Sequence, residues 1–173
     1  LALNLFAASG MQFFVSSSFS KSFSLYGERV GALSVVTASK EESARVLSQV
    51  KRVIRTNYSN PPTHGGSVVA TVLSSPELRG LWETELATMR NRIRAMRESF
   101  VEKLKAKGVA EDFSFILRQR GMFSYTGLSA EQVARLQSEF GIYAVSTARI
   151  CVAALNTRNI DYAVDSLATV LKG

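Results

Sequence analysis

Residues Ser16 to Gly31 read SSSFSKSFSLYGERVG and place a single lysine, Lys21, among hydroxyl and aromatic side chains, with Arg29 eight positions later. A lysine amine attacks a carbonyl carbon to form a Schiff base when burial or a neighbouring cation lowers its pKa. A phosphomonoester is bound well by a forked guanidinium and short hydroxyl donors, which Arg29 and Ser18 supply. The segment therefore predicts a site for a phosphorylated aldehyde. A solvated basic loop is the alternative that residue types alone leave open.

The predicted reactive loop lies between two short runs of β-branched and aromatic residues, 12–15 and 30–37. Such runs are typical of buried strands, so we expect the loop to be held at strand ends. Four phenylalanines are expected to give the lysine an apolar environment: Phe13, Phe14, Phe19 and Phe23.

Helices are expected in the next part of the chain. Ser39 followed by Glu42 forms a capping-box pattern, and apolar residues at helical spacing continue from there to Arg55. A break rich in proline and glycine follows, and then a short helix over 67–73.

The dipeptide Ser75-Pro76 is a strong helix start, and one apolar face continues from it to Gly108, which predicts a long helix over about 76–107. The elements expected after it are a strand near 113–117, a helix opened by Ser129 with Gln132 and closed at Gly141, a strand over 142–148 and a last helix over about 157–171. This order indicates an α/β protein.

The composition of the 173 residues indicates a globular protein, with 46% hydrophobic residues and a formal charge of +7. Four arginines of the long helix alternate with apolar residues, which favours a solvated helix face over a nucleic-acid surface: Arg90, Arg92, Arg94 and Arg97. Cys151 is the only cysteine and His64 the only histidine, so we expect no disulfide and no metal site, and a cytoplasmic setting. We also expect no membrane partner, because no apolar run is long enough to cross a bilayer.

Four segments, in this order, carry a resemblance to a known family. They are Ser18 to Gly31, Ile54 to Pro62 (IRTNYSNPP), Gln119 to Ser124 (QRGMFS) and Ala148 to Ala153 (ARICVA). Together they resemble class I pyridoxal-phosphate aminotransferases, the group that acts on aspartate and aromatic amino acids. The resemblance implies the fold type I of pyridoxal-phosphate-dependent transferases, with pyridoxal 5'-phosphate as cofactor.

The resemblance also implies roles for particular residues. Lys21 would be the catalytic lysine that binds the cofactor aldehyde, and Ser18 and Arg29 would bind its phosphate. Arg149 would clamp the α-carboxylate of the substrate, where a structural ion pair is the alternative that the residue type leaves open.

Two further residues are implied as substrate-binding. Arg55 would reach the site of a neighbouring subunit and meet a dicarboxylate side chain, which implies a homodimer with shared active sites; a helix C-terminal cation is the plain alternative. Phe123 would line the substrate pocket, whereas Tyr125 is expected to be a core aromatic. Tyr26 is expected either at an interface or near the cofactor.

Members of this family are much longer, so we expect the chain to be their C-terminal part. Residues 1–88 would end the large cofactor-binding domain and residues 89–173 would form the small C-terminal domain. In relatives an aspartate upstream of the lysine pairs with the pyridine nitrogen. The aspartates of this chain, Asp112, Asp161 and Asp165, all follow Lys21, so that partner is not expected here.

The expected function is the transfer of an amino group between an aromatic or dicarboxylic L-amino acid and 2-oxoglutarate. The segment Gly27 to Gly31 (GERVG) favours the aromatic branch, and acceptance of aspartate and glutamate is expected through Arg55. Two alternatives remain open. One is a non-catalytic fragment of such an enzyme, and the other is lyase, decarboxylase or racemase chemistry on the same cofactor.

Overall fold

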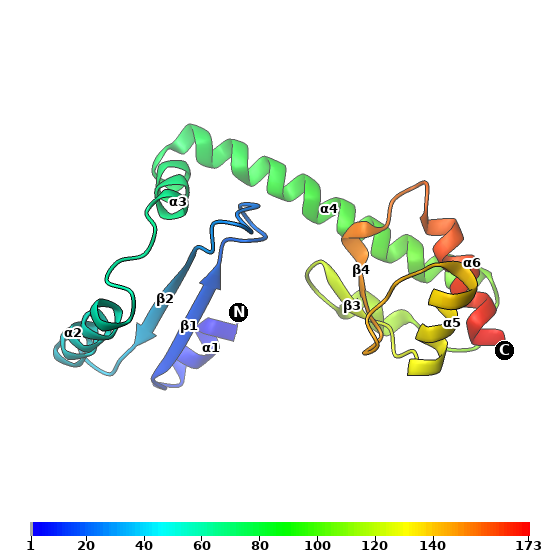
Figure 1. The fold of residues 1–173 in the computed structure, drawn as a ribbon, viewed down its shortest axis with the longest axis horizontal. Coiled ribbons are helices and arrows are strands. Elements are labelled where there is room, and N and C mark those ends of the chain that lie inside the picture. Colours follow the sequence, from blue (N-terminus) through cyan, green and yellow to red (C-terminus); the bar gives the residue numbers. More distant parts are fainter. Residues whose placement is uncertain (1) are drawn as a thin grey trace. The chain divides into compact units, whose positions relative to one another are not determined.

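The computed structural model describes residues 2–173, which form two compact units that divide between Glu83 and Thr84 (Figure 1). The first unit contains helix α1 (Ala2–Ala8), strands β1 (Phe13–Ser18) and β2 (Gly31–Val36), and helices α2 (Lys40–Asn57) and α3 (His64–Ser74). Helix α4 (Pro76–Ala106) begins in the first unit and ends in the second.

Strands β1 and β2 pair antiparallel, with a register that runs from Phe13 opposite Val36 to Ser18 opposite Gly31. The predicted position of two strands on either side of the lysine loop is therefore confirmed. The prediction that they are buried is wrong, since Phe14 is 72% exposed and Leu33 is 55% exposed. A two-stranded sheet needs layers on both faces to bury alternate side chains, and within residues 2–173 these strands lack them.

Helix α2 begins where its capping residues predict. The Ser39 hydroxyl accepts a 3.2 Å hydrogen bond from the amide of Glu42, and the Glu42 carboxylate accepts from the amide of Ala38 at 2.8 Å. The carboxylate thus bonds one residue before the one that the standard capping box uses. Helix α3 begins at His64, three residues earlier than the predicted start at residue 67.

Helix α4 confirms the predicted long helix. The Ser75 hydroxyl accepts from the amide of Leu78 at 3.3 Å, and Gly108, at φ 67°, follows the helix end. Near its C-terminal end α4 buries Phe100 and Leu104 in the core of the second unit. The predicted solvated arginine face is wrong at Arg97, which is only 6% exposed.

The second unit has one hydrophobic core, built from α4, η1 (Ser114–Arg118), α5 (Ala130–Phe140) and α6 (Ile160–Lys172). Helix α5 has the predicted capping box, and Gly141 ends it in the left-handed conformation. The most deeply buried hydrophobic residues of this unit are Leu104, Ile116, Ala148, Val152 and Val164, each no more than 1% exposed.

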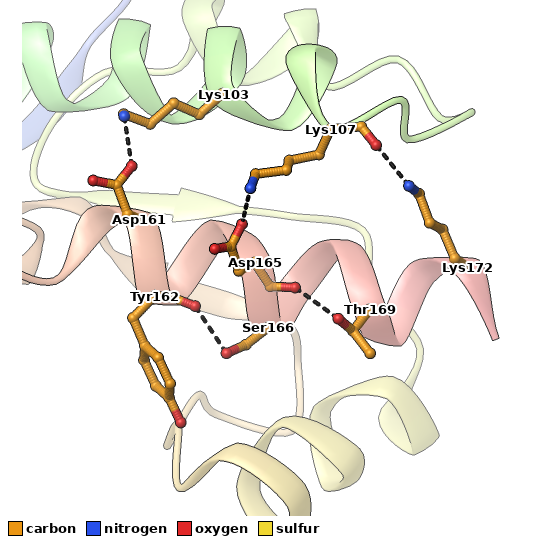
Figure 2. A network of polar contacts seen from close by, with 8 residues as sticks. All are labelled: Lys103, Lys107, Asp161, Tyr162, Asp165, Ser166, Thr169 and Lys172. Atoms are coloured by element: carbon orange, nitrogen blue, oxygen red, sulfur yellow. Dashed lines mark hydrogen bonds and ion pairs between the residues drawn. The ribbon is translucent and has the colours of Figure 1, made fainter.

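Ion pairs and hydrogen bonds attach α6 to the C-terminal part of α4 (Figure 2). Lys103 and Lys107 pair with Asp161 and Asp165 at 2.5 Å each, and the Lys172 ammonium donates to the Lys107 carbonyl at 2.6 Å. Each carboxylate is separated from the next by one turn of α6, so the pairs match the spacing of the lysines on α4. They fix the register between the two helices.

Two strand predictions in this unit are wrong. Residues 114–118 form the 3-10 helix η1, because the Asp112 carboxylate accepts from both the amide and the hydroxyl of Ser114 at 2.8 Å and starts a turn. Residues 142–148 pair with no strand, and the strand is instead β4 (Arg149–Cys151), antiparallel to β3 (Phe123–Tyr125). Ile142 and Ala144 pack against the core and Ala148 belongs to it, while residues 146–147 form a turn. The 3-10 helix η2 (Val152–Ala154) follows β4.

No helix among residues 2–173 combines the length and apolar character that crossing a bilayer requires.

Candidate active site

The loop between β1 and β2 carries three of the predicted site residues, Ser18, Lys21 and Arg29. The antiparallel register brings its two ends together, because Ser18 lies opposite Gly31 and the Phe19 amide donates to the Val30 carbonyl at 3.2 Å. The hydroxyl donor and the guanidinium that the sequence assigns to a phosphate therefore lie at the base of one hairpin.

Glycine is required at the first residue of β2. A Cβ atom on Gly31 would lie 2.5 Å from the Ser17 carbonyl oxygen, a backbone atom of the facing strand. The close approach of the two strands at the base of the loop is therefore possible only without a side chain at this position.

The lysine is exposed, and its ammonium lies 5.2 Å from the centre of the Tyr26 ring. Tyr26 thus contacts Lys21 within the lysine loop, and its expected place at an interface or near the cofactor stays a prediction. The four phenylalanines do not provide the expected apolar environment as a group. Phe14 is exposed, while Phe19 and Phe23 pack on each other edge to face, with ring centres 5.5 Å apart.

Trp82 of α4 anchors the lysine loop, a role that the sequence did not predict. Its indole nitrogen donates a 2.7 Å hydrogen bond to the carbonyl of Ser22, the residue after the lysine. Its ring stacks on Phe23 with centres 4.6 Å apart. The sequence analysis counted this residue only as part of the apolar helix face, and nothing in its spacing distinguishes it from the other members.

The phosphate-binding candidates have hydrogen-bonding capacity left for a ligand. The Ser18 hydroxyl oxygen accepts from the amide of Ser20 at 3.2 Å, so its own proton can still be donated. Arg29 has a left-handed backbone, with φ 52°, and one guanidinium nitrogen donates to the Tyr26 carbonyl at 2.9 Å. The other guanidinium donors suit an anion at the loop.

Helix α3 packs on the end of the same loop. A Cβ on Gly65 would lie 3.0 Å from the Cβ of Glu28 and 3.1 Å from side-chain atoms of Val30, and Gly65 itself is buried. The loop is therefore held between two helices of its own unit, by Trp82 at one point and by Gly65 at another.

Arg55 lies in the last turn of α2, as predicted, and is exposed. One of its guanidinium nitrogens donates to the Ser59 hydroxyl. This arrangement fits both readings of Arg55, as a helix C-terminal cation and as a donor to a carboxylate from outside the unit.

The second unit carries the other two predicted site residues, Arg149 and Phe123. Arg149 is the first residue of β4, is exposed, and has its guanidinium carbon 4.7 Å from the centre of the Phe123 ring. The alternative of a structural ion pair is not supported, because among residues 2–173 no carboxylate pairs with Arg149. A cation on an exposed aromatic face gains about 0.5–1 kcal/mol and keeps its donors available.

Polar side chains, among them the buried Arg97, hold the loop that presents Phe123. The Gln119 amide side chain bonds both the amide and the carbonyl of Tyr125, at 2.8 and 2.9 Å. The buried Arg97 donates to the Gly121 carbonyl at 2.7 Å and to the Ser124 hydroxyl at 3.3 Å. Burial, and to a smaller degree the charge of Arg120, lowers the pKa of Arg97.

A cavity of about 370 Å³ within the second unit has Arg149 as its one charged lining residue among the described residues, and Phe123 also lines it. The expectation that Tyr125 is a core aromatic is wrong, since this side chain is 57% exposed on β3. Its neighbours Ser124 and Thr126 are the buried ones, at 2% and 3% exposed.

Within residues 2–173 no group of three metal-ligating side chains gathers. His64 lies 3.9 Å from a carboxylate oxygen of Glu28 and is mostly exposed.

Solved structures define the class to which this fold belongs. The aromatic-amino-acid aminotransferase from Burkholderia pseudomallei, covalently bound to pyridoxal phosphate, matches 98% of this chain with a TM-score of 0.94 and 70% identity. An aromatic amino acid aminotransferase from Psychrobacter sp. B6 matches 99% with a TM-score of 0.95 and 48% identity. The predicted class is thereby confirmed: the chain has the mixed α/β fold type I of pyridoxal-phosphate-dependent transferases.

The family model for aminotransferase class I and II matches residues 2–167, and the chain belongs to that family. The aspartate aminotransferase of Pseudomonas aeruginosa is 71% identical over 98% of the chain, and the aromatic-amino-acid aminotransferase of Escherichia coli is 49% identical over 98%. In both cases the chain covers 43% of the relative. It thus spans less than half the length of these curated relatives.

Proposed function

We propose that this chain is part of an aminotransferase that moves an amino group between an aromatic or dicarboxylic L-amino acid and 2-oxoglutarate, with pyridoxal 5'-phosphate as cofactor. The observation that carries the proposal is the β1–β2 hairpin, which holds Lys21 in its loop and Ser18 and Arg29 at its base. Family membership supports the same chemistry.

The residues present in the hairpin fit the cofactor. A lysine amine suits an aldehyde, and a hydroxyl with a guanidinium suits a phosphate. Pyridoxal phosphate would supply an aldehyde that condenses with amines and a conjugated ring that withdraws electrons from the substrate Cα.

Each candidate residue has a separate task in the proposed reaction. The Lys21 amine, once released from the cofactor, would take the proton from the substrate Cα. It would then donate a proton to the carbon that carried the cofactor aldehyde. Arg149 binds the α-carboxylate with two parallel hydrogen bonds and so orients the Cα–H bond. Ser18 and Arg29 hold the phosphate.

The substrate side chain is proposed to meet Phe123 or Arg55. The exposed ring of Phe123 beside Arg149 suits an aromatic side chain next to a carboxylate. Arg55 suits the second carboxylate of a dicarboxylic substrate. In a homodimer it would contribute its guanidinium to the site of the other subunit. Relatives with 98% coverage include enzymes named for aspartate and for aromatic amino acids, which supports both side-chain classes.

The division of the chain is part of the proposal. Residues 1–88 would belong to a large cofactor-binding domain and residues 89–173 to a small one, in a cytoplasmic enzyme. The second candidate function, a non-catalytic fragment of such an enzyme, is consistent with the 43% coverage of the relatives. Lyase or decarboxylase chemistry would need only one arginine that binds a carboxylate, so the presence of both Arg149 and Arg55 favours transamination over it.

Reduction with borohydride in the presence of pyridoxal phosphate tests the proposal. After reduction, intact mass and peptide mapping should show one adduct per chain, on Lys21, because the same hairpin carries this amine and both phosphate-binding candidates. Lys21→Ala should remove this adduct and abolish transamination in the active protein, whereas Lys40→Ala, at an exposed lysine on α2, should change neither. Scattered labelling of surface lysines, or turnover that survives in Lys21→Ala, would overturn the assignment.

A further inference from the structure

Ala148, the residue directly before Arg149, has an unusual backbone conformation. Its φ is 61°, in the left-handed region that residues with a side chain seldom adopt. Its methyl group is part of the hydrophobic core, and the residue is only 1% exposed. A non-glycine residue keeps such a conformation only where the surroundings impose it, and strain of this kind gathers at functional sites.

Two hydrogen bonds from Thr126 hold the carbonyl of Ala148. The Thr126 hydroxyl donates to the Ala148 carbonyl at 2.8 Å, and the Thr126 amide donates to the same oxygen at 3.0 Å. Thr126 is itself 3% exposed, so water does not compete for these bonds. On its other side the Ala148 amide donates to the Val145 carbonyl at 2.9 Å.

The direction in which the Arg149 side chain points depends on how the Ala148 carbonyl is held. The left-handed residue turns the chain sharply, and the next residue enters β4 opposite Tyr125. From there the Arg149 guanidinium lies over the Phe123 ring. Without the hydroxyl bond only the Thr126 amide would hold the Ala148 carbonyl, so the strained φ could relax toward the ordinary region and the first residue of β4 would turn with it.

We propose that Thr126 is a positioning residue for Arg149: its hydroxyl fixes the Ala148 carbonyl, and through it the guanidinium that recognises the substrate carboxylate. The carboxylate part of this inference rests on the proposed function of Arg149. Thr126→Val tests the hydroxyl alone, because valine keeps the backbone amide and nearly the same shape but lacks the O–H donor.

The first test measures the position of Arg149 without reference to activity. The Phe123 ring shifts the NMR signals of Arg149 side-chain protons that lie over it. Thr126→Val should move these signals toward their unshifted values, whereas Thr126→Ser, which keeps the hydroxyl, should leave them in place. Signals that stay in place in Thr126→Val, with the fold shown intact by circular dichroism, would overturn the proposal.

The second test measures recognition of a carboxylate, by calorimetric titration of the cofactor-loaded protein with 2-oxoglutarate. Thr126→Val should weaken binding about twofold to tenfold, the effect of one lost hydrogen bond, and Thr126→Ser should restore it. Ala148→Gly, which relieves the left-handed strain and leaves Thr126 bonded, should keep most of the affinity.

Arg149→Ala separates the two proposals. If Arg149→Ala abolishes binding of 2-oxoglutarate but Thr126→Val does not weaken that binding, the positioning role of Thr126 is wrong and the proposed function stands. If Arg149→Ala leaves binding unchanged, the proposed function fails at this residue, and so does the carboxylate part of this inference. The NMR shifts then decide whether Thr126 sets the side-chain position at all.

Discussion

Removing the indole of Trp82 should loosen the lysine loop. Trp82→Phe keeps an aromatic ring to stack on Phe23 but deletes the 2.7 Å hydrogen bond to the Ser22 carbonyl. Because Ser22 is half-buried, water can partly replace the donor, and the expected cost is about 1 kcal/mol, at the low end for a lost hydrogen bond. Trp82→Ala also loses the ring stack, worth about 0.5–1.5 kcal/mol beyond the buried area. Its total cost should be about 2–3 kcal/mol.

Hydrogen exchange measured by mass spectrometry or NMR gives the readout, through two amides that the loop itself protects. The amide of Phe19 donates to the Val30 carbonyl at 3.2 Å, and that of Phe23 donates to the Phe19 carbonyl at 3.1 Å. Since about 1.4 kcal/mol corresponds to a tenfold change, exchange should rise about fivefold in Trp82→Phe and about 30-fold or more in Trp82→Ala.

Leu81→Ala is the matched control, since Leu81 precedes Trp82 in the same helix but is 60% exposed. It should leave exchange of the loop amides within about twofold of the unmodified chain, because exposed substitutions change stability little. Equal exchange in Trp82→Ala and Leu81→Ala would refute the claim that α4 anchors the lysine loop.

Two further predictions concern the base of the hairpin and the stability of the second unit. Gly31→Ala should separate β1 from β2 at the base of the lysine loop, because its Cβ would meet the Ser17 carbonyl oxygen at 2.5 Å. The expected loss in the free energy of unfolding, measured in urea, is about 1–3 kcal/mol. An unchanged urea midpoint would contradict this prediction. The hydrogen bond from Arg135 lowers the pKa of Glu139, so this pair contributes stability above about pH 4.3, the ordinary pKa of glutamate, and loses it as the pH falls further. Glu139→Gln should therefore lose less stability between pH 6 and pH 3 than the unmodified chain, and equal losses would rule out this contribution.

The elements that the sequence predicted well are those whose signals are local. The Ser129 and Gln132 pair and the left-handed Gly141 bound α5 because capping bonds form within one helical turn. Ser75 and Pro76 start α4 for the same reason.

The predictions that failed needed a distant partner. The alternating residues 142–148 were expected as a strand, but pairing depends on which backbone lies alongside, and β3 aligns only with residues 149–151. Arg97 was expected in water, but the loop at Gly121 and Ser124 covers it and supplies two acceptors. Tyr125 was expected in the core, but it points to the exposed face of β3, since successive strand residues alternate between faces.

The sequence by itself determined the chemistry of the candidate site. It shows a lysine, a hydroxyl and a guanidinium within a short loop and an arginine beside an apolar run, since side-chain types are a property of the sequence alone. Only the tertiary structure decided how these groups are held. Trp82 reaches the loop from 60 residues further along the chain, and Thr126 fixes Ala148 from 22 residues before it. Such contacts form because folding brings distant segments together, and no local pattern along the chain encodes which segments will meet.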